Sequence, residues 1–600
     1  MVQSIRPGHL LLAAVVLGAP RGPLVDALTE RERATHALNR LAFGPRPGEI
    51  DRVLARGVDA WIADQLRPTR GRPAAVATLL AAWPDLQRSP AELRRTFPPP
   101  ATLARLGNGG RLSREDSLAL ATQVRAGRTF VAQLLTARVA RAVAAERQLD
   151  EVMADFWLNH FNVFVGKNSA MRYLLPSYEQ DVIRPHVLGK FRMLLGAVAK
   201  SPAMLVYLDN TQSVADSTRP TLVDRGTQQR RLNLARRAVR RGRVANVDSA
   251  TLERVLQRRP RGLNENYARE LLELHTLGVD GGYSQQDVIE VARALTGWGV
   301  RSGQADGFSF NRATHDAGEK QILGERFPAG RGEEEGERVL DVLARHPSTA
   351  RHIARKLVMR FVADEPPDAL VDRAADVFRE TDGDIREVVR AIVTSPEFFS
   401  RGTWRAKVKS PFEVVVSAVR ALGGQPDTTV VSAAIVAQLG QPLYGHQAPD
   451  GWPETGHEWM NTGAILGRIN FGLQVGASRL PGTRLSSWSE YARLSVLPLA
   501  AQVDGIVATL LHGAAASETR DVLTSGRNPL MEGAATDVDN RGEEPSMTGV
   551  VRRRGDAAAS DRSNPLARRG AALTGRPLPP LRGLDQLIAL AIGSPEFQRR

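Results

Sequence analysis

Four consecutive segments of this chain, residues 339–343, 353–361, 370–378 and 385–393, place apolar side chains at the spacing of an amphipathic helix. Helices of this kind bury their apolar stripes against one another. The pattern constrains the fold more than any other feature, because a half-buried strand would need alternation with a period of two. It predicts a body built like a helix bundle.

The composition agrees with a helical fold. Only 5% of the 600 residues are aromatic, whereas Ala, Arg and Leu are abundant. Straight-chain residues lose little rotamer freedom in a helix, so this composition favours helix over sheet. The hydrophobic content of 42% is that of a globular protein, and the length suits two to four domains. We therefore expect a mainly α, bundle-like body with long irregular loops and little or no sheet.

The chain divides into regions by composition and periodicity. Residues 1–25 contain a short apolar run, 10–17, followed by Gly18-Ala19-Pro20, which fits either a secretory leader or an ordinary first helix. The run is too short to span a bilayer. Beyond it we expect an N-terminal helical region (26–150), a central helical core (151–480) with a basic variable insertion at about 211–261, a helical extension (481–524), a disordered linker (525–580) and a C-terminal helix (581–600).

The net charge of +15 and the pI near 10.6 raise the question of an anionic partner such as nucleic acid. Only seven of the 80 basic residues are lysine, and an Arg- and Ala-rich chain of this kind is typical of coding bias. A nucleic-acid surface needs basic side chains on one face. The densest arginine pairs, at 230–231, 236–237 and 240–241, fall in the insertion, so nucleic-acid binding ranks last. The chain has no cysteine, which excludes disulfides, thiolate metal sites and a cysteine nucleophile.

The stretch 263–278 is the densest in groups that could bind or catalyse. Asn264 is predicted to cap a helix over residues 265–277, and Gly278 is predicted to end it. At about 100° per residue this helix has two faces. The core face consists of Tyr267, Leu271 and Leu274, and the polar stripe consists of Asn266, Glu270 and Glu273. The stripe is either an exposed, salt-bridged surface or one wall of a site.

His275 lies outside this polar stripe. On a straight helix it is rotated by about 140° from Glu270 and by about 160° from Glu273. Helical metal motifs use ligands three or four residues apart, which project to one side. The two glutamates and His275 therefore cannot share one ion on such a helix.

Three other places carry candidate site residues. His160 stands among the aromatic residues of 155–164, so it is either a hydrogen-bonded interior histidine or a ligand. His315 and Asp316 are neighbours in a polar loop, where they form either a turn or an acid–base pair. Trp452 and Glu454 belong to a loop rich in Gly and Pro, whose tryptophans are suited to wall a pocket.

A short motif occurs three times directly after a predicted helix. It consists of Ser201-Pro202, Ser395-Pro396 and Ser594-Pro595. A serine followed by a proline is typical of a helix N-terminus, because the hydroxyl caps a backbone N–H and the proline suits the first helical position. We expect a new helix to start at each copy.

Several long motifs follow one another along the chain. They are residues 38–45 (LNRLAFGP), the 264–278 helix with its turn 280–283, residues 296–298 (TGW), His315-Asp316 with Lys320 and Gly324, residues 451–456 (GWPETG), residues 459–463 (WMNTG) and the ending 594–600. Together they resemble the bacterial family called domain of unknown function 1800, over nearly the whole chain. That family has no established activity to carry over. The resemblance implies export, since many members look exported, and a partner, since members are often encoded beside an uncharacterised protein with an alkaline-phosphatase-like fold.

Three functions fit these observations. The first is a periplasmic, envelope-associated or secreted binding or accessory factor, and its ligand or partner groove is lined by Asn266, Glu270, Glu273, His160, His315, Asp316, Trp452 and Glu454. The alternative is a hydrolase-like enzyme that uses the same carboxylates and histidines, with a hard cation. The last is nucleic-acid binding through the insertion; a cytoplasmic location is the alternative to export. No nucleophile elbow, phosphate-binding glycine loop or zinc helix occurs, so the sequence names no reaction, ligand or cofactor.

Overall fold

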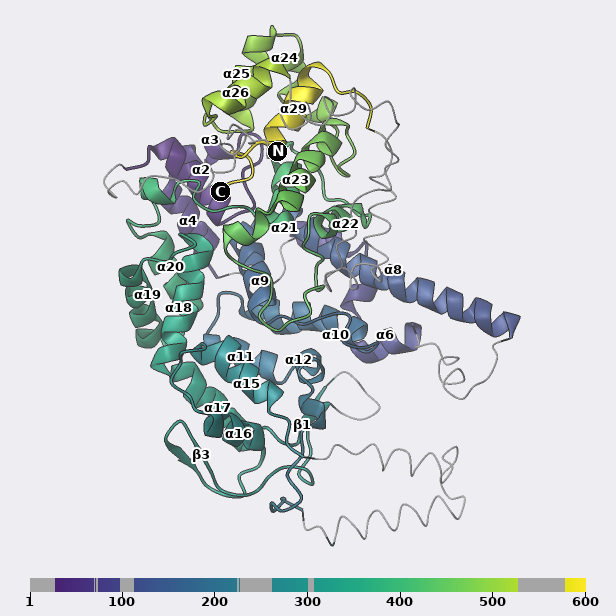
Figure 1. The fold of residues 1–600 in the computed structure, drawn as a ribbon, viewed down its shortest axis with the longest axis vertical. Coiled ribbons are helices and arrows are strands. Elements are labelled where there is room, and N and C mark those ends of the chain that lie inside the picture. The colour runs from purple at the N-terminus through teal and green to yellow at the C-terminus, as the bar shows by residue number, and fades with distance from the viewer. Residues whose placement is uncertain are drawn as a thin grey trace, which may run out of the picture.

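The computed structural model describes residues 27–68, 71, 74–97, 113–223, 226, 262–300, 307–526 and 578–600. The predicted leader (1–25), the arginine pairs of the insertion and nearly all of the predicted linker (525–580) lie outside the described residues. The described chain is mainly α, as the composition predicts. The molecule is elongated, with the C-terminal helices at one end and two small sheets at the other (Figure 1).

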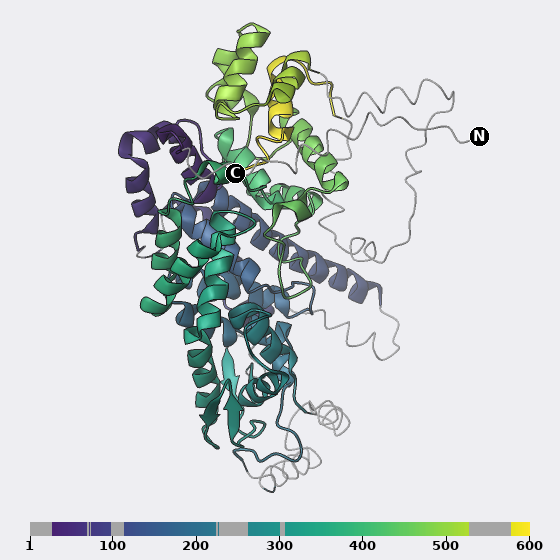
Figure 2. The same ribbon diagram turned by 60° about the vertical axis from the view of Figure 1, so that its left-hand side comes forward.

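The N-terminal region is helical. Its elements are α2 (Glu30–Arg40), α3 (Glu49–Arg56), α4 (Val58–Leu66), α5 (Ala74–Leu80), η1 (Pro84–Gln87), α6 (Pro90–Thr96) and α8 (Arg114–Ala144). Helix α2 starts at a capping box in which Thr29 and Glu32 satisfy each other's backbone N–H groups. Helix α8 begins at the Ser113 cap and projects from the body in both views (Figures 1 and 2).

The first half of the central core surrounds a long buried helix, α9 (Gln148–His160). It continues with α10 (Met171–Ser177), η2 (Tyr178–Ile183), η3 (Arg184–His186), α11 (Phe191–Ala199), α12 (Pro202–Tyr207), η4 (Asn210–Gln212), α15 (Asn266–Leu272), η5 (Glu273–Leu277) and α16 (Gln285–Ala294). Nearly every residue of α9 is buried, so this helix forms the centre of the core.

Two antiparallel two-stranded sheets follow. Strand β1 (Trp298–Val300) pairs with β2 (Phe308–Phe310), and Trp298 is opposite Phe310. Strand β3 (Lys320–Ile322) pairs with β4 (Glu325–Phe327) across a two-residue turn at 323–324. With three residues a strand, they confirm the prediction of little sheet among the residues described.

The four segments with the spacing of amphipathic helices, 339–343, 353–361, 370–378 and 385–393, are helices packed in succession. They are α17 (Glu333–Arg345), α18 (Pro347–Phe361), α19 (Asp368–Glu380) and α20 (Ile385–Val393). Their apolar stripes, such as Ile353, Leu357 and Phe361 of α18, are fully buried. The prediction of a bundle-like body is confirmed here, because the stripes have one another to pack against.

The second half of the core and the C-terminal region are also helical. The elements are η6 (Arg401–Thr403), α21 (Pro411–Ala421), α22 (Val431–Gln438), η7 (Gly456–Trp459), α23 (Thr462–Gly476), η8 (Leu485–Ser487), α24 (Tyr491–Ser495), α25 (Leu499–Thr509), α26 (Ser517–Ser525) and α29 (Gly583–Gly593). Helix α29 packs directly on α23: a Cβ at Gly472 would lie 2.4 Å from the Ala589 carbonyl oxygen. None of the helices described is long and apolar enough to cross a membrane.

The prediction of one continuous α-helix over 265–277 is wrong. Helix α15 runs only to Leu272, and η5 is π-helical. The Thr276 hydroxyl donates to the Leu271 carbonyl oxygen at 2.6 Å, five residues back, which supports the wider turn. Gly278 ends the element with φ +85°, as predicted. The wider turn leaves Leu274 half-buried, although it was predicted to face the core.

The Ser-Pro motif starts a helix in only one of its three copies. The Ser201 hydroxyl accepts a hydrogen bond from Ala203 N and caps α12. The Ser395 and Ser594 hydroxyls instead accept from Phe398 N and Phe597 N, three residues on, within single turns, so no helix starts at these two copies. Each turn ends in a buried phenylalanine, Phe398 or Phe597. Packing of this side chain in the core holds the turn in place without a following helical turn.

Candidate functional site

Two amide side chains, Asn159 of α9 and Asn162 just beyond its end, hold the loop 445–459. Asn159 Oδ1 accepts from Trp452 N at 2.7 Å, and its Nδ2 donates to Trp452 O at 2.8 Å and to Glu454 Oε1 at 3.2 Å. Asn162 Nδ2 donates to the carbonyl oxygens of His446 and Ala448. These bonds replace the sheet or helix partners that the loop backbone lacks. They join segments almost 300 residues apart in sequence.

Glycines allow this loop to approach the helices closely. Gly451 has φ +79°, and a Cβ there would lie 2.4 Å from the Asn159 carbonyl oxygen. A Cβ at Gly456 would lie 2.9 Å from Val408, and Gly456 N donates to the Asp364 carboxylate at 2.7 Å. At position 451 only glycine combines the left-handed conformation with this close contact. The glycine spacing of the 451–456 motif is therefore a packing requirement.

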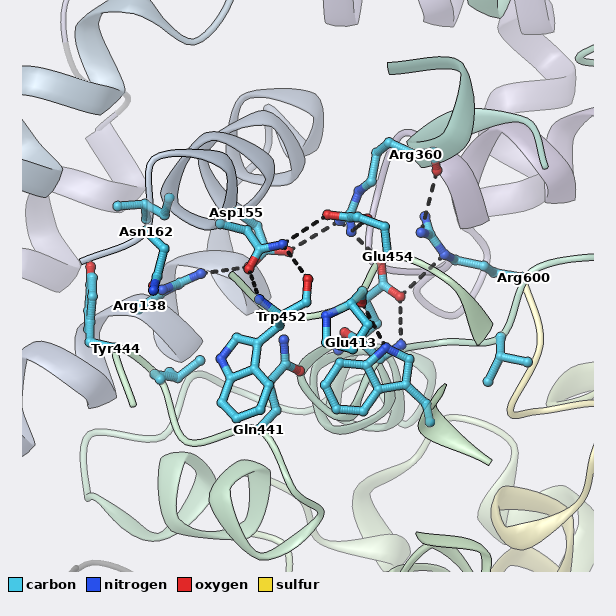
Figure 3. Close-up of a pocket in the computed structure, with 17 residues that line it drawn as sticks. Arg138, Asp155, Asn162, Arg360, Glu413, Gln441, Tyr444, Trp452, Glu454 and Arg600 are labelled. Carbon is cyan, nitrogen blue, oxygen red and sulfur yellow. Dashed lines mark hydrogen bonds and ion pairs between the residues drawn. The ribbon is translucent and has the colours of Figure 1, made fainter. Parts of the chain in front are cut away.

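The loop closes over a small pocket between α9, α18 and α21 (Figure 3). The cavity volume is about 30 Å³, which exceeds the roughly 10–15 Å³ that one water molecule requires. Trp452 and Trp459 form one wall, with ring centroids 5.9 Å apart. Trp452 is half-buried and Trp459 is buried, so Trp452 is the ring nearer to solvent.

Three arginines and three carboxylates line the same pocket. Arg360 of α18 lies 3.2 Å from Asp155, 3.1 Å from Glu413 and 3.5 Å from Glu454. Arg138 pairs with Asp155 at 2.7 Å, and Arg600 pairs with Glu413 at 3.2 Å. Burial raises the pKa of Glu413, but Arg600 and Arg360 outweigh burial and hold that pKa below its usual value. Each of the three carboxylates is therefore already engaged by at least one arginine.

The sequence reasoning missed Arg138, Arg360, Glu413 and Arg600. These residues come from four distant segments, and only Arg600 stands in one of the motifs, the ending 594–600. One signal was readable: His352, Lys356 and Arg360 recur at four-residue intervals on a segment predicted to be helical. Such spacing places them on one face of α18.

His160 is an interior histidine, 2% exposed. Its Nε2 lies 3.2 Å from the His275 carbonyl oxygen, and its ring centroid lies 6.3 Å from that of His275 and 6.1 Å from that of His352. Burial lowers the pKa of His160 well below its ordinary value, and the charge of Lys356 lowers it further. Burial likewise lowers the pKa of His275 to about 3 and that of His352 to about 4. The three rings are therefore neutral at pH 7.

The polar stripe of α15 and η5 faces partly toward the same loop. Asn266 is exposed at the start of α15, and Glu273 accepts a hydrogen bond from the Tyr283 hydroxyl at 3.1 Å. Glu270 is half-buried. Its pKa is raised by burial first and then by the charges of Glu273 and Asp450, so Asp450 of the loop lies near it. No described hydrogen bond joins either glutamate to His160, His315 or Trp452.

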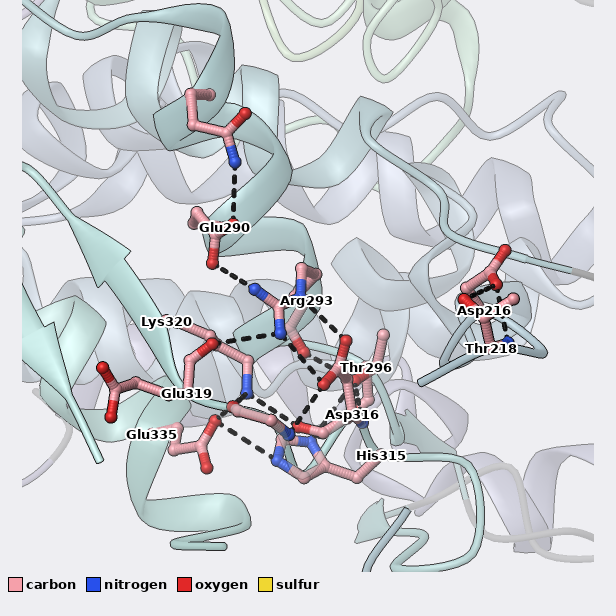
Figure 4. A network of polar contacts seen from close by, with 12 residues as sticks. Asp216, Thr218, Glu290, Arg293, Thr296, His315, Asp316, Glu319, Lys320 and Glu335 are labelled. Atoms are coloured by element: carbon pink, nitrogen blue, oxygen red, sulfur yellow. Dashed lines mark hydrogen bonds and ion pairs between the residues drawn. The ribbon is translucent and has the colours of Figure 1, made fainter. Parts of the chain in front are cut away.

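His315 and Asp316 belong to a separate buried network near the sheets (Figure 4). Arg293 of α16 donates to both Asp316 carboxylate oxygens, at 2.8 and 3.2 Å. His315 Nδ1 donates to the Thr296 carbonyl oxygen at 2.8 Å, and its Nε2 lies 3.4 Å from Glu335, which also pairs with Lys320. The network ties the β3–β4 hairpin to α16 and α17. Because its members are buried and paired with one another, this arrangement supports a structural role.

Of the eight predicted site residues, His160, Trp452 and Glu454 therefore gather around α9. The pKa of Glu270 is raised in part by the charge of Asp450, which belongs to the same loop as Trp452 and Glu454. Asn266 and Glu273 lie on the adjoining surface, and His315 and Asp316 lie elsewhere. Within the described part of the chain, no three His, Asp or Glu side chains are arranged to hold a metal ion. The hard-cation alternative thus gains no support from these residues.

The motifs that build this loop and its helical supports extend over most of the chain. A family model described as protein of unknown function (DUF1800) matches residues 36–599. The chain belongs to the DUF1800 family. No curated protein and no solved structure matches it. In this DUF1800 protein, the 264–278 and 451–456 motifs both meet α9, because His160 Nε2 lies 3.2 Å from the His275 carbonyl oxygen and Asn159 Oδ1 accepts from Trp452 N.

Proposed function

We propose that this DUF1800 protein is a binding or accessory factor whose ligand contacts the junction of α9, α15, α18 and the loop 445–459. The observation that carries the proposal is the tethered loop. Asn159 and Asn162 fix its backbone, and it presents a half-buried tryptophan, Trp452, beside a polar pocket. An aromatic ring next to a few fixed polar groups is the usual make-up of a ligand site.

Binding is better supported than hydrolysis because the pocket carboxylates are occupied. Asp155 and Glu413 each contact two arginines, and Glu454 contacts Arg360 and Asn159. A general base must be able to take a proton near neutral pH. A carboxylate held ionised by arginine is a weak base, so the pocket favours recognition over proton transfer.

A ligand screen by thermal unfolding tests the proposal. Amino acids, organic acids, nucleotides, neutral saccharides and short peptides are added in turn to the full chain. A ligand at 100 times its Kd adds about 2.7 kcal/mol to the stability and raises the Tm. We expect one class to raise the Tm of the wild type but not that of Trp452→Ala.

The exposed Val496, which is 80% accessible and lies in the C-terminal extension, gives the matched control. Val496→Ala should respond to the ligand as the wild type does. If no class raises the Tm of the wild type, or if Trp452→Ala responds fully, the proposed site is wrong.

We also propose that the protein is exported or envelope-associated. The apolar run 10–17 with its small-residue ending and the family resemblance support this location. Cell fractionation with N-terminal sequencing of the mature protein tests it. An intact N-terminus recovered only from the cytoplasmic fraction would contradict export.

A further inference from the structure

A second, smaller cavity lies where the motif 38–45 meets the ending 594–600. Each of these two motifs supplies three of the lining residues, and the others come from α21, from the segment before it and from the end of α25 with the turn that follows. The cavity shares no lining residue with the pocket walled by Trp452 and Trp459. It is therefore a separate site, built by segments from the two ends of the chain.

The backbone of Lys409 fixes this side chain at the cavity. Lys409 N donates to the Gln598 carbonyl oxygen at 2.8 Å, and the Lys409 carbonyl oxygen accepts from Arg468 Nη2 at 2.8 Å. Its ammonium nitrogen lies 4.2 Å from the centre of the Phe597 ring, and both side chains line the cavity. The position of the charge is thus set by contacts on both sides of the residue.

Lys409 is a buried cation without a carboxylate partner. It is 5% exposed, and within the described part of the chain no carboxylate lies at ion-pair distance from it. The other buried lysines both have such a partner, Glu335 for Lys320 and Asp364 for Lys407. The aromatic ring offsets part of the cost of burying the ammonium group. An anion in the cavity would offset the rest.

Positive charge exceeds negative charge around this cavity. Arg405 and Arg599 line it together with Lys409, whereas Glu596 is the single carboxylate among the lining residues. Both carboxylate oxygens of Glu596 already accept hydrogen bonds at 2.9 Å, from a backbone N–H and from a threonine hydroxyl. Burial and then the charge of Arg405 lower the pKa of Lys409 to about 7, in line with an uncompensated positive site. The cavity therefore favours an anion.

The size of the cavity restricts which anion fits. Its volume is about 10 Å³, close to the roughly 10–15 Å³ that one water molecule requires. Gly44, with φ +82°, lines the space, and a Cβ there would lie 3.3 Å from the Ser417 Cβ. A halide ion is only slightly larger than a water molecule. Phosphate and sulfate, with four oxygens around a central atom, are too large.

Two neutral side chains complete the lining with N–H groups. Asn39 of α2 supplies an amide, and His512 supplies an imidazole. Burial first and then the charges of Arg405 and Lys409 lower the pKa of His512 to about 3, so this ring is neutral at pH 7. Donors of this kind bind an anion without adding a further charge to the cavity.

We propose that this cavity binds one halide ion, such as chloride, with the Lys409 ammonium group as its principal ligand. Arg405 and Arg599 supply the surrounding positive charge. The bound ion would join the ending 594–600 to α2 and α21 by pairing with a cation that all three enclose. This inference does not depend on the proposed binding function, because the two cavities have no residue in common.

Thermal unfolding of the full chain tests the inference. Sodium chloride replaces sodium gluconate at constant ionic strength, so that screening stays the same and only an ion small enough for the cavity is varied. We expect the Tm to rise saturably with chloride, by about 1 °C at ten times the Kd. Bromide should act as chloride does, and acetate and phosphate should not.

A pair of lysine variants locates the effect. Lys409→Met keeps the length of the side chain and its packing on Phe597 but removes the charge, so it should abolish the chloride dependence of the Tm. Lys190→Met removes an exposed lysine that pairs with Asp384, and it should keep the full dependence.

A second measurement uses the wild type alone and does not depend on the folding of a variant. Crystals of the full chain are soaked in sodium bromide, and anomalous scattering locates the bound ions. We expect a bromide peak inside the cavity, in contact with Lys409 Nζ.

Four results would overturn the inference. They are a Tm that does not change with chloride at constant ionic strength, a full chloride response in Lys409→Met, bromide peaks only outside the cavity, and stabilisation by acetate or phosphate without any by chloride. None of these results bears on the ligand screen at Trp452, so the two proposals stand or fall separately.

Discussion

At the scale of residues, single side chains decide what the site can do. Arg360 contacts three carboxylates at once, and Asn159 satisfies the backbone of a loop that has no regular partner. The sequence shows neither role, because the same residue letter can stand for a side chain on an exposed helix surface or for one in a buried network. Burial and partners separate the two cases.

Arg360→Met should destabilise the protein by about 3–5 kcal/mol, because in this buried network Glu454 loses its arginine partner, and Asp155 and Glu413 each lose one of their two. Arg360 is 5% exposed in this network. The free energy of unfolding in urea measures the loss. The matched control is Arg373→Met, which removes an arginine that is 52% exposed and paired with Glu397. It should change stability by no more than about 1 kcal/mol. Equal losses for the two variants would show that the network is not a buried ionic centre.

At the scale of elements, the pattern of apolar residues predicted which segments are helical. The capping motifs predicted less well where helices begin and end. The apolar stripes of α17 to α20 were found from periodicity alone. The π-helical turn η5 was not, because a threonine hydroxyl bonds a carbonyl oxygen four residues back in an ordinary α-helix as well, so Thr276 does not by itself indicate the wider turn. The Ser395 and Ser594 turns show the same limit: capping chemistry permits a helix without requiring one.

The contact between α23 and α29 depends on glycine. Gly472→Ala should destabilise the protein by about 1–3 kcal/mol, because the new methyl group meets the backbone of α29, which cannot yield cheaply. Its Cβ would lie 2.4 Å from the Ala589 carbonyl oxygen. Hydrogen exchange of the α29 amides, together with thermal unfolding, measures the loosening.

The same helix supplies the control. A Cβ at Gly467 would meet only Leu439, at an ordinary 3.6 Å. Gly467→Ala should therefore stabilise the protein, by up to about 1 kcal/mol, through helix propensity. If both substitutions shift stability in the same direction, close packing of α29 is not the reason for Gly472.

At the scale of the whole molecule, buried neutral histidines couple stability to pH. Burial holds the folded-state pKa of His275 at about 3 and that of His352 at about 4, against about 6.5 in the unfolded chain. Between these values the unfolded state binds protons that the folded state does not. The free energy of unfolding should therefore be highest above pH 6.5 and fall below it, by about 1.4 kcal/mol per pH unit for each such histidine.

Urea unfolding at a series of pH values measures this slope. The carboxylates with lowered pKa, such as Glu413, add to the loss only below their usual range near pH 4.5. Between pH 6.5 and 5 the fall in the free energy of unfolding therefore comes from the histidines. His275→Gln should reduce the slope there by about one proton, and His457→Gln, at an exposed position, should not. A flat profile in this window would contradict the neutral cluster.

The sequence by itself determined the helical class, the bundle-like α17 to α20 body, the family and most of the segments that meet at the site. These follow from local physics: periodicity, capping and the chemistry of glycine and proline. The tertiary structure decided which candidates share a site, setting His160, Trp452 and Glu454 around α9, with Arg360 beside Glu454, and placing His315 and Asp316 in a separate network. Those outcomes depend on contacts between residues hundreds of positions apart, and a local pattern carries no information about such contacts.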